Sequence, residues 1–135
     1  MRVTLLASLA VLAALLLLPL AGPPAHPSPD PFRLVDAEHV SNLLGKPGVY
    51  VFDANTREVY VRGHLPGARF VSYKDYPAST LPQDRGATLI FYCKNPRCMA
   101  SHEAARRAAE MGYSNVLVMR DGIDGWGEAG KPVER

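Results

Sequence analysis

The only two cysteines of this 135-residue chain lie close together, and cationic residues stand between them. They occur in the segment Cys93-Lys94-Asn95-Pro96-Arg97-Cys98. Two cysteines are too few to form the disulfide framework of a small secreted domain. The spacing therefore predicts a reactive site rather than a structural disulfide.

The position of Cys93 gives a physical reason for reactivity. It directly follows the apolar run Thr88–Tyr92 and precedes a helical pattern at 101–111. The thiolate is the nucleophilic form, and the pKa of a cysteine falls near helix N-termini and cationic side chains, which here are Lys94 and Arg97. Unpaired N–H groups at a helix start also stabilise an anionic sulfur. On spacing alone, the alternative that Cys93 is an ordinary apolar core residue stays open.

Competing chemistries fit the same segment less well. A phosphatase-type Cys-x5-Arg pattern requires arginine at position 99, where Met99 stands, so phosphate and arsenate chemistry are not favoured. The segment and the residues that follow it also contain potential soft metal ligands that would suit Cu(I) or zinc, namely Cys93, Cys98, Met99 and His102. Their spacing matches no standard zinc pattern, and no Cys-x-x-Cys-His haem motif occurs. We therefore predict neither a metal nor another cofactor.

The elements that must position the site alternate between strand and helix patterns. Strands are predicted at 49–52, 69–71, 88–92 and 115–119. Helices are predicted from an Asp36 cap to Leu44, from a Thr56 cap to Val61, at 101–111 and at 123–129. This alternation predicts an α/β fold with a central parallel sheet flanked by helices. Ligands bind beyond the carboxyl ends of such strands, where Cys93 falls.

The N-terminal part differs in composition from the rest. Residues 1–22 contain the apolar run Leu5–Leu20 after a short positive start, which predicts a signal peptide or, alternatively, a retained N-terminal anchor. Residues 23–31 contain five prolines and are interpreted as a tether. The folded domain is then 32–135, long enough for a hydrophobic core. We expect an exported protein of the periplasm or cell envelope, with membrane contact only through an uncleaved N-terminal segment.

The charge balance excludes one class of partner. Fifteen Lys and Arg residues face thirteen Asp and Glu residues, which gives a net charge of only +2. Because a nucleic-acid binder needs a concentrated basic face, no nucleic-acid partner is predicted. The sequence identifies no protein partner.

Ordered motifs across 33–134 resemble the rhodanese-like (sulfurtransferase) domain family. Asp53–Tyr60 followed by Gly63-His64-Leu65-Pro66-Gly67-Ala68 resembles its first signature, and Leu89–Cys93 resembles the strand that delivers its catalytic cysteine. Met111–Val116 followed by Asp121–Trp126 resembles its second signature, which ends in Gly-x-x-x-Trp.

The resemblance implies a three-layer rhodanese-like fold with about five parallel strands. It also implies a double displacement at Cys93: the thiolate takes sulfane sulfur from a small sulfur-containing anion such as thiosulfate, and a thiol or cyanide acceptor removes it from the persulfide. The backbone of the following loop would be the anion cradle. That loop comprises Lys94, Asn95, Pro96, Arg97, Cys98, Met99 and Ala100.

Three departures from the family pattern bear on function. The loop after Cys93 is longer than usual, Asn55 stands where the family often has arginine, and Cys98 is an unusual second thiol. Cys98 is a candidate resolving thiol that would form a reversible disulfide with Cys93 in an oxidising compartment. The same pair supports an alternative from another class, a non-catalytic redox-active or disulfide-locked binding module of the envelope.

Three further residues are expected to have structural roles. We expect His64 to fix its turn through hydrogen bonds and Trp126 to pack in the core. His102 is interpreted as a solvated residue of the first helical turn, with tuning of Cys93 or Cys98 as the alternative.

Overall fold

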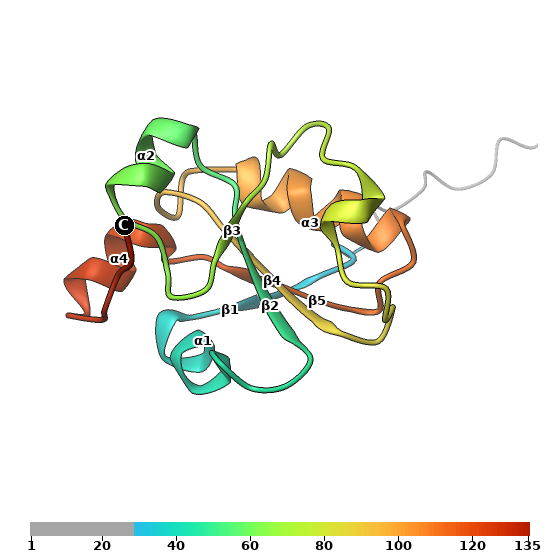
Figure 1. Cartoon of the computed structure of the whole chain (residues 1–135), viewed down its shortest axis with the longest axis horizontal. Helices are drawn as coiled ribbons and strands as arrows, with labels where there is room; N and C mark the ends of the chain where they lie inside the picture. The colour runs from blue at the N-terminus through green and yellow to red at the C-terminus, as the bar shows by residue number, and fades with distance from the viewer. Residues whose placement is uncertain (1–28) are drawn as a thin grey trace, which may run out of the picture.

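The computed structural model describes residues 29–135, which form a five-stranded sheet whose neighbouring strands all run parallel (Figure 1). The strand order is β1-β5-β4-β2-β3. The strands are β1 (Arg33–Val35), β2 (Val49–Asp53), β3 (Arg69–Phe70), β4 (Thr88–Tyr92) and β5 (Asn115–Met119). The predicted signal segment and most of the Pro-rich tether lie outside the described residues. Within 29–135, none of the helices has the length and apolar character needed to span a membrane.

Residues 29–135 also form four α-helices and one 3-10 helix, which lie between the strands except for the last helix, which follows β5. They are α1 (Ala37–Leu43), α2 (Arg57–Arg62), η1 (Ala78–Thr80), α3 (Ala100–Glu110) and α4 (Gly122–Glu128). The predicted caps of the first two are confirmed: the Asp36 carboxylate accepts from His39 N at 2.8 Å, and the Thr56 hydroxyl accepts from Val59 N at 3.4 Å. Such caps matter because helices this short gain little from propensity alone.

The predicted α/β architecture is confirmed, and the four predicted strands are present to within one residue. The sequence analysis missed β1 and η1. Two of the three β1 residues are exposed, so β1 has neither the length nor the apolar run by which strands are recognised. It exists because it pairs with β5, from Arg33 opposite Leu117 to Val35 opposite Met119.

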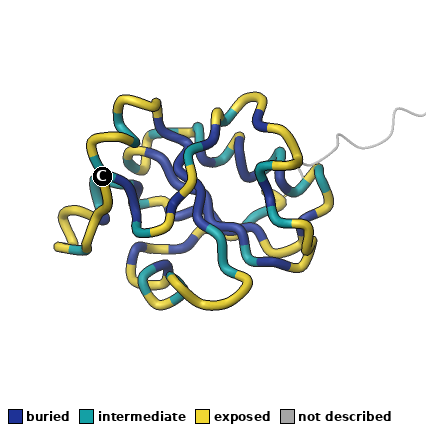
Figure 2. The backbone as a smooth tube through the Cα atoms, viewed as in Figure 1, coloured by how far each residue is buried: buried dark blue, intermediate teal, exposed yellow. Residues whose placement is uncertain are grey.

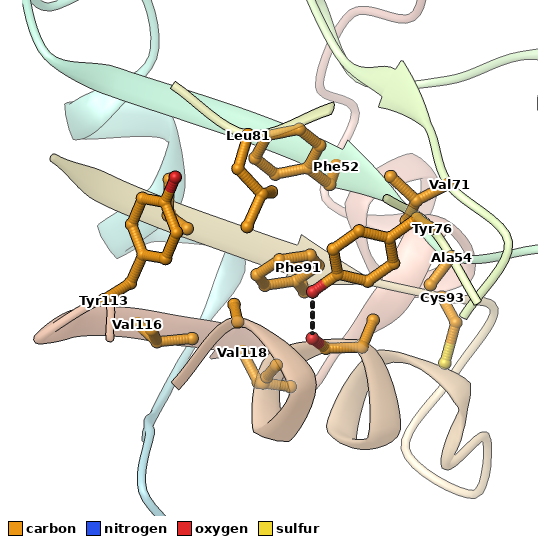
Figure 3. Packing of buried hydrophobic residues seen from close by; sticks show 14 of the residues in the cluster. Phe52, Ala54, Val71, Tyr76, Leu81, Phe91, Cys93, Tyr113, Val116 and Val118 are labelled. Carbon is orange, nitrogen blue, oxygen red and sulfur yellow. Dashed lines mark hydrogen bonds between the residues drawn. The ribbon is translucent and has the colours of Figure 1, made fainter. Parts of the chain in front are cut away.

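The centre of the sheet is buried (Figure 2), and apolar side chains form one core cluster on each of its faces. Strand β4 shows this best, because Leu89 and Phe91 enter one core cluster while Ile90 and Tyr92 enter the other. The first cluster includes the alanine face of α3, and the second includes residues of α1 and Trp126 of α4 (Figure 3 shows the first). A strand buried on both faces explains the uninterrupted apolar run that precedes Cys93.

A buried polar cluster ties the carboxyl ends of β2 and β4 together. The Tyr92 hydroxyl donates to Asp53 Oδ2 at 2.7 Å, and Asn55 N donates to Asp53 Oδ1 at 2.8 Å. Leu65 N in turn donates to the Tyr92 hydroxyl at 3.0 Å. Burial raises the pKa of the Asp53 carboxyl, while these hydrogen bonds and nearby His64 act in the opposite direction. The motif Gly63–Ala68 is thus attached to the strand that carries Cys93.

We predict that Tyr92→Phe lowers the free energy of unfolding by roughly 2 kcal/mol at neutral pH, because it removes a hydrogen bond to a buried carboxylate. The raised Asp53 pKa means that the native state binds more protons than the unfolded chain between the ordinary and the raised pKa, so stability falls as pH rises through that window. Losing the Tyr92 donor raises this pKa further. The deficit should therefore shrink at about pH 4.5, where the carboxyl is more often protonated.

Urea unfolding at the two pH values measures this. Tyr113→Phe is the matched control, because the Tyr113 hydroxyl donates to the neutral Pro82 carbonyl and its cost should not depend on pH. A Tyr92→Phe deficit of equal size at both pH values would contradict the assigned role of Asp53.

Candidate active site

Cys93 is the first residue after β4, and its side chain is only 2% exposed. It lies at the edge of the core cluster that contains Ala54, Val71 and Tyr76, on the side where α3 begins (Figure 3). The following loop, Lys94–Met99, leads directly into α3 at Ala100. The expected position of Cys93, between a buried strand and a helix start, is confirmed.

The first turn of α4 holds the start of this loop. Ile123 N donates to Cys93 O at 2.8 Å, and Asp124 N donates to Lys94 O at 2.9 Å. The approach is close enough that a Cβ on Gly122, whose φ is +66°, would overlap the Lys94 carbonyl. Gly122 is therefore needed both for its backbone conformation and for its lack of a side chain.

Asn95 organises the middle of the loop. Its side-chain Oδ1 accepts from Arg97 N at 3.1 Å, and its carbonyl accepts from Cys98 N at 3.0 Å. These two N–H groups belong to the expected anion cradle, and in this structure they point to Asn95. The cradle itself stays a prediction.

The structure pairs Cys93 with Cys98 as a disulfide. Their Cα atoms are 6.2 Å apart, inside the usual range of about 4.4–6.8 Å for bonded cysteines. The carbonyl oxygen of Cys98 lies 3.1 Å from Cys93 Sγ. The geometric condition for the expected disulfide is thus met, and its reversibility stays a prediction.

Ser101 is a site residue that the sequence analysis missed. Its Oγ lies 3.3 Å from Cys93 Sγ, and the residue is 2% exposed. A hydroxyl at this place can donate a hydrogen bond to a thiolate. The sequence pattern could have indicated that Ser101 is buried, because its helical spacing places it on the same face of α3 as the buried alanines. These are Ala104, Ala105 and Ala108.

The two cations of the loop have different surroundings. Lys94 Nζ donates to Asp124 Oδ1 at 2.9 Å in an ion pair, and Asn95 Nδ2 lies 3.5 Å from Asp124 Oδ2. The Arg97 side chain is exposed, and no ion pair within 29–135 includes it. Arg97 is therefore the cation of the loop that is available to an anionic ligand.

A shallow cavity of about 350 Å³ borders the loop on the side of α4. It is lined by Asn95, Pro96, Asp121, Asp124, Gly125 and Glu128. Three carboxylates make this side unfavourable for an anion. No group of three or more His, Cys, Asp or Glu side chains in the described part of the chain is placed to hold a metal ion.

The other singled-out residues have structural contacts. His64 Nδ1 hydrogen-bonds with Tyr60 O at 3.0 Å, which confirms its role in the turn, and Trp126 is buried as expected. The interpretation of His102 as solvated is wrong. Its ring packs edge-on against Phe32 with centroids 5.3 Å apart, and burial, followed by the Arg106 charge, lowers its pKa. Phe32 and Asp30, at the start of the described residues, contact this side of α3, and helical periodicity does not reveal such a contact.

Comparisons with known proteins agree with this fold. The sequence profile of the rhodanese-like domain matches residues 36–129. The rice protein arsenate reductase 2.1 is 29% identical over 111 residues, which cover 73% of this chain and 69% of that protein.

Solved structures show the same fold. The BH2092 protein from Bacillus halodurans superposes with a TM-score of 0.67 at 27% identity, and the match covers 76% of each chain. A thiosulfate sulfurtransferase from Pseudomonas aeruginosa superposes with a TM-score of 0.63 at 22% identity, over 76% of this chain and 19% of that one.

Substitution of Gly122 tests the contact between α4 and the loop. We predict that Gly130→Ala costs roughly 1 kcal/mol of stability, because its φ is +68° and a new Cβ would meet open space. Gly122→Ala has the same conformational cost and should lose roughly 1–3 kcal/mol more, because the new Cβ overlaps the Lys94 backbone.

Urea unfolding measures both losses. In a Cys98→Ser background, the reaction rate of Cys93 with a small thiol reagent should change only with Gly122→Ala. Equal effects of the two alanines on stability and on this rate would show that the contact does not position the loop.

Proposed function

The chain belongs to the rhodanese-like domain family, and we propose that it is a sulfurtransferase that carries sulfane sulfur as a persulfide on Cys93. The main support is the placement of Cys93 at the end of β4, with Ser101 Oγ 3.3 Å from its sulfur and its carbonyl held by α4. A buried nucleophile on a fixed backbone, beside a hydroxyl donor and a helix start, suits an anionic sulfur intermediate.

The reaction has two half-reactions. The Cys93 thiolate attacks the outer sulfur of thiosulfate, the S–S bond of the donor breaks, and sulfite leaves with the bonding electron pair. The terminal sulfur of the resulting persulfide is then attacked by a thiol or cyanide, which regenerates the thiolate. The donor reacts only after the Cys93–Cys98 bond has been reduced, since a disulfide sulfur is no thiolate.

We propose that Arg97 attracts the anionic donor. Its charge is not neutralised by an ion pair in the described part of the chain, whereas Lys94 is paired with Asp124. The carboxylates beside α4 disfavour approach from that side. A donor anion is therefore directed to the face of the loop that carries Arg97.

We further propose that residues 1–22 direct export to the periplasm or cell envelope and that 23–31 form a tether. The apolar run and the prolines support this. Cell fractionation of the full chain, compared with a chain starting at residue 29, tests it. Equal distribution of both chains in the cytosol would contradict export.

A second candidate is the disulfide-locked binding module, which the pairing of Cys93 with Cys98 favours. It differs from the sulfurtransferase in a measurable way, because a locked module transfers no sulfur even after reduction. The likeness to an arsenate reductase makes arsenate the appropriate competing substrate, although Met99 stands where Cys-x5-Arg chemistry needs arginine.

We predict that the reduced protein transfers sulfur from thiosulfate to cyanide, and that Cys93→Ser abolishes this while Cys98→Ser keeps at least part of it. In this proposal Cys93 is the nucleophile that attacks thiosulfate, whereas Cys98, its disulfide partner, takes no part in that attack. Thiocyanate formation is the measurement, and arsenate reduction is assayed in parallel. Equal transfer by wild type and Cys93→Ser would refute the assignment, and inactivity of both the reduced wild type and Cys98→Ser would favour the binding module.

We predict that Arg97→Gln raises the KM for thiosulfate several-fold with a smaller effect on kcat, because it removes charge that attracts the donor before the chemical step. Arg85→Gln removes the same charge from an exposed side chain in the segment preceding β4, at the other end of that strand from Cys93, and is the matched control. Added salt should weaken donor binding by wild type more than by Arg97→Gln. Identical KM values for both variants would exclude a local role of Arg97.

A further inference from the structure

We propose that Cys98 resolves the Cys93 persulfide when no small acceptor is present, so that the domain then releases its bound sulfur as hydrosulfide and consumes a dithiol reductant. This inference rests on the proposed function, since the persulfide must form first. It adds an activity, reductant-dependent sulfide release from thiosulfate, and assigns its resolving residue.

The placement of Cys98 supports a direct attack. Cys93 and Cys98 are bonded through their sulfurs in this structure, and the loop between them is closed by Cys98 N donating to Asn95 O at 3.0 Å. Immediately after Cys98, α3 begins, with His102 N and Glu103 N both donating to Met99 O at 3.1 Å. Cys98 is therefore held between a closed turn and a helix start, which limits how far its sulfur moves from Cys93 after reduction.

The backbone of the loop favours the disulfide as a product. The Cys98 carbonyl oxygen lies 3.1 Å from Cys93 Sγ, where it would repel a persulfide anion. The N–H groups of Arg97 and Cys98, which could stabilise such an anion, are satisfied by Asn95. This loop conformation suits a neutral disulfide better than a long-lived persulfide.

The resolving step balances without an added oxidant. Cys98 Sγ attacks Cys93 Sγ, the bond between Cys93 Sγ and the outer sulfur breaks, and the outer sulfur leaves as hydrosulfide with the proton of the Cys98 thiol. The sulfane sulfur gains two electrons, and the two cysteines together lose two as their disulfide forms. The disulfide is then reduced by an external dithiol, which becomes a disulfide in turn.

The unequal exposure of the cysteines indicates where this reductant attacks. Cys98 is partly exposed, whereas Cys93 is 2% exposed. Because thiol–disulfide exchange requires access to the attacked sulfur, the reductant attacks Cys98. Cys93 then leaves as a thiolate, beside the Ser101 hydroxyl that can donate to it.

A single-turnover experiment tests the proposal. The full chain is reduced, freed of reductant and mixed with thiosulfate without cyanide, and then sulfite, sulfide and the protein mass are measured. Wild type should release one equivalent of sulfite and one of sulfide per protein and end as the disulfide. Cys98→Ser should release sulfite only and keep one added sulfur atom on Cys93. Val61→Ser, which changes an exposed side chain of α2 outside the loop, should behave as wild type.

The outcomes separate the two proposals. Sulfite release by wild type with a persistent persulfide and no sulfide would overturn the role of Cys98 and leave the sulfurtransferase standing. Absence of sulfite would overturn the proposed function, and loading Cys93 with inorganic polysulfide then tests the resolving step by itself. After desalting, loss of the added sulfur with disulfide formation in wild type, but not in Cys98→Ser, supports the step; retention of the sulfur in both overturns it.

Discussion

Two backbone hydrogen bonds, from Ile123 and Asp124 to the carbonyls of Cys93 and Lys94, fix the loop on which the site depends. They join α4, which packs through Trp126 on one face of the sheet, to a cysteine that belongs to the core on the opposite face. The contact is possible only because Gly122 has no Cβ. The position of the nucleophile is thus set by both layers of helices together, and not by its own strand alone.

The polar groups of the same loop form hydrogen bonds and an ion pair within the protein, which limits how many of them could contact a ligand. Asn95 accepts from the N–H groups of Arg97 and Cys98, and Asp124 neutralises Lys94. The Arg97 charge and the hydroxyl of Ser101 beside the sulfur are not used by these contacts. For the N–H groups of Arg97 and Cys98 to bind an anion, they would first have to leave Asn95.

Local patterns were sufficient for most of the fold. The uninterrupted apolar run of β4, the caps Asp36 and Thr56, and the alanine face of α3 each reflect an interaction within a few residues, and each was predicted correctly. Strand β1 was not predicted, because its three residues form a strand only through pairing with β5, some eighty positions later in the sequence. The solvated interpretation of His102 failed for the same reason, since Phe32 reaches it from the start of the domain.

For the site, the sequence by itself indicated Cys93 as the candidate nucleophile, because a cysteine between a buried strand and a helix start is visible in the local pattern. It also identified Cys98 as the unusual second thiol of the loop. Only the tertiary structure decided that Ser101 contacts the sulfur, that Asp124 forms an ion pair with Lys94, and that Gly122 must be small. The physical reason is that Asp124 lies thirty residues from Lys94, so their charges meet only once the sheet has placed α4 beside the loop.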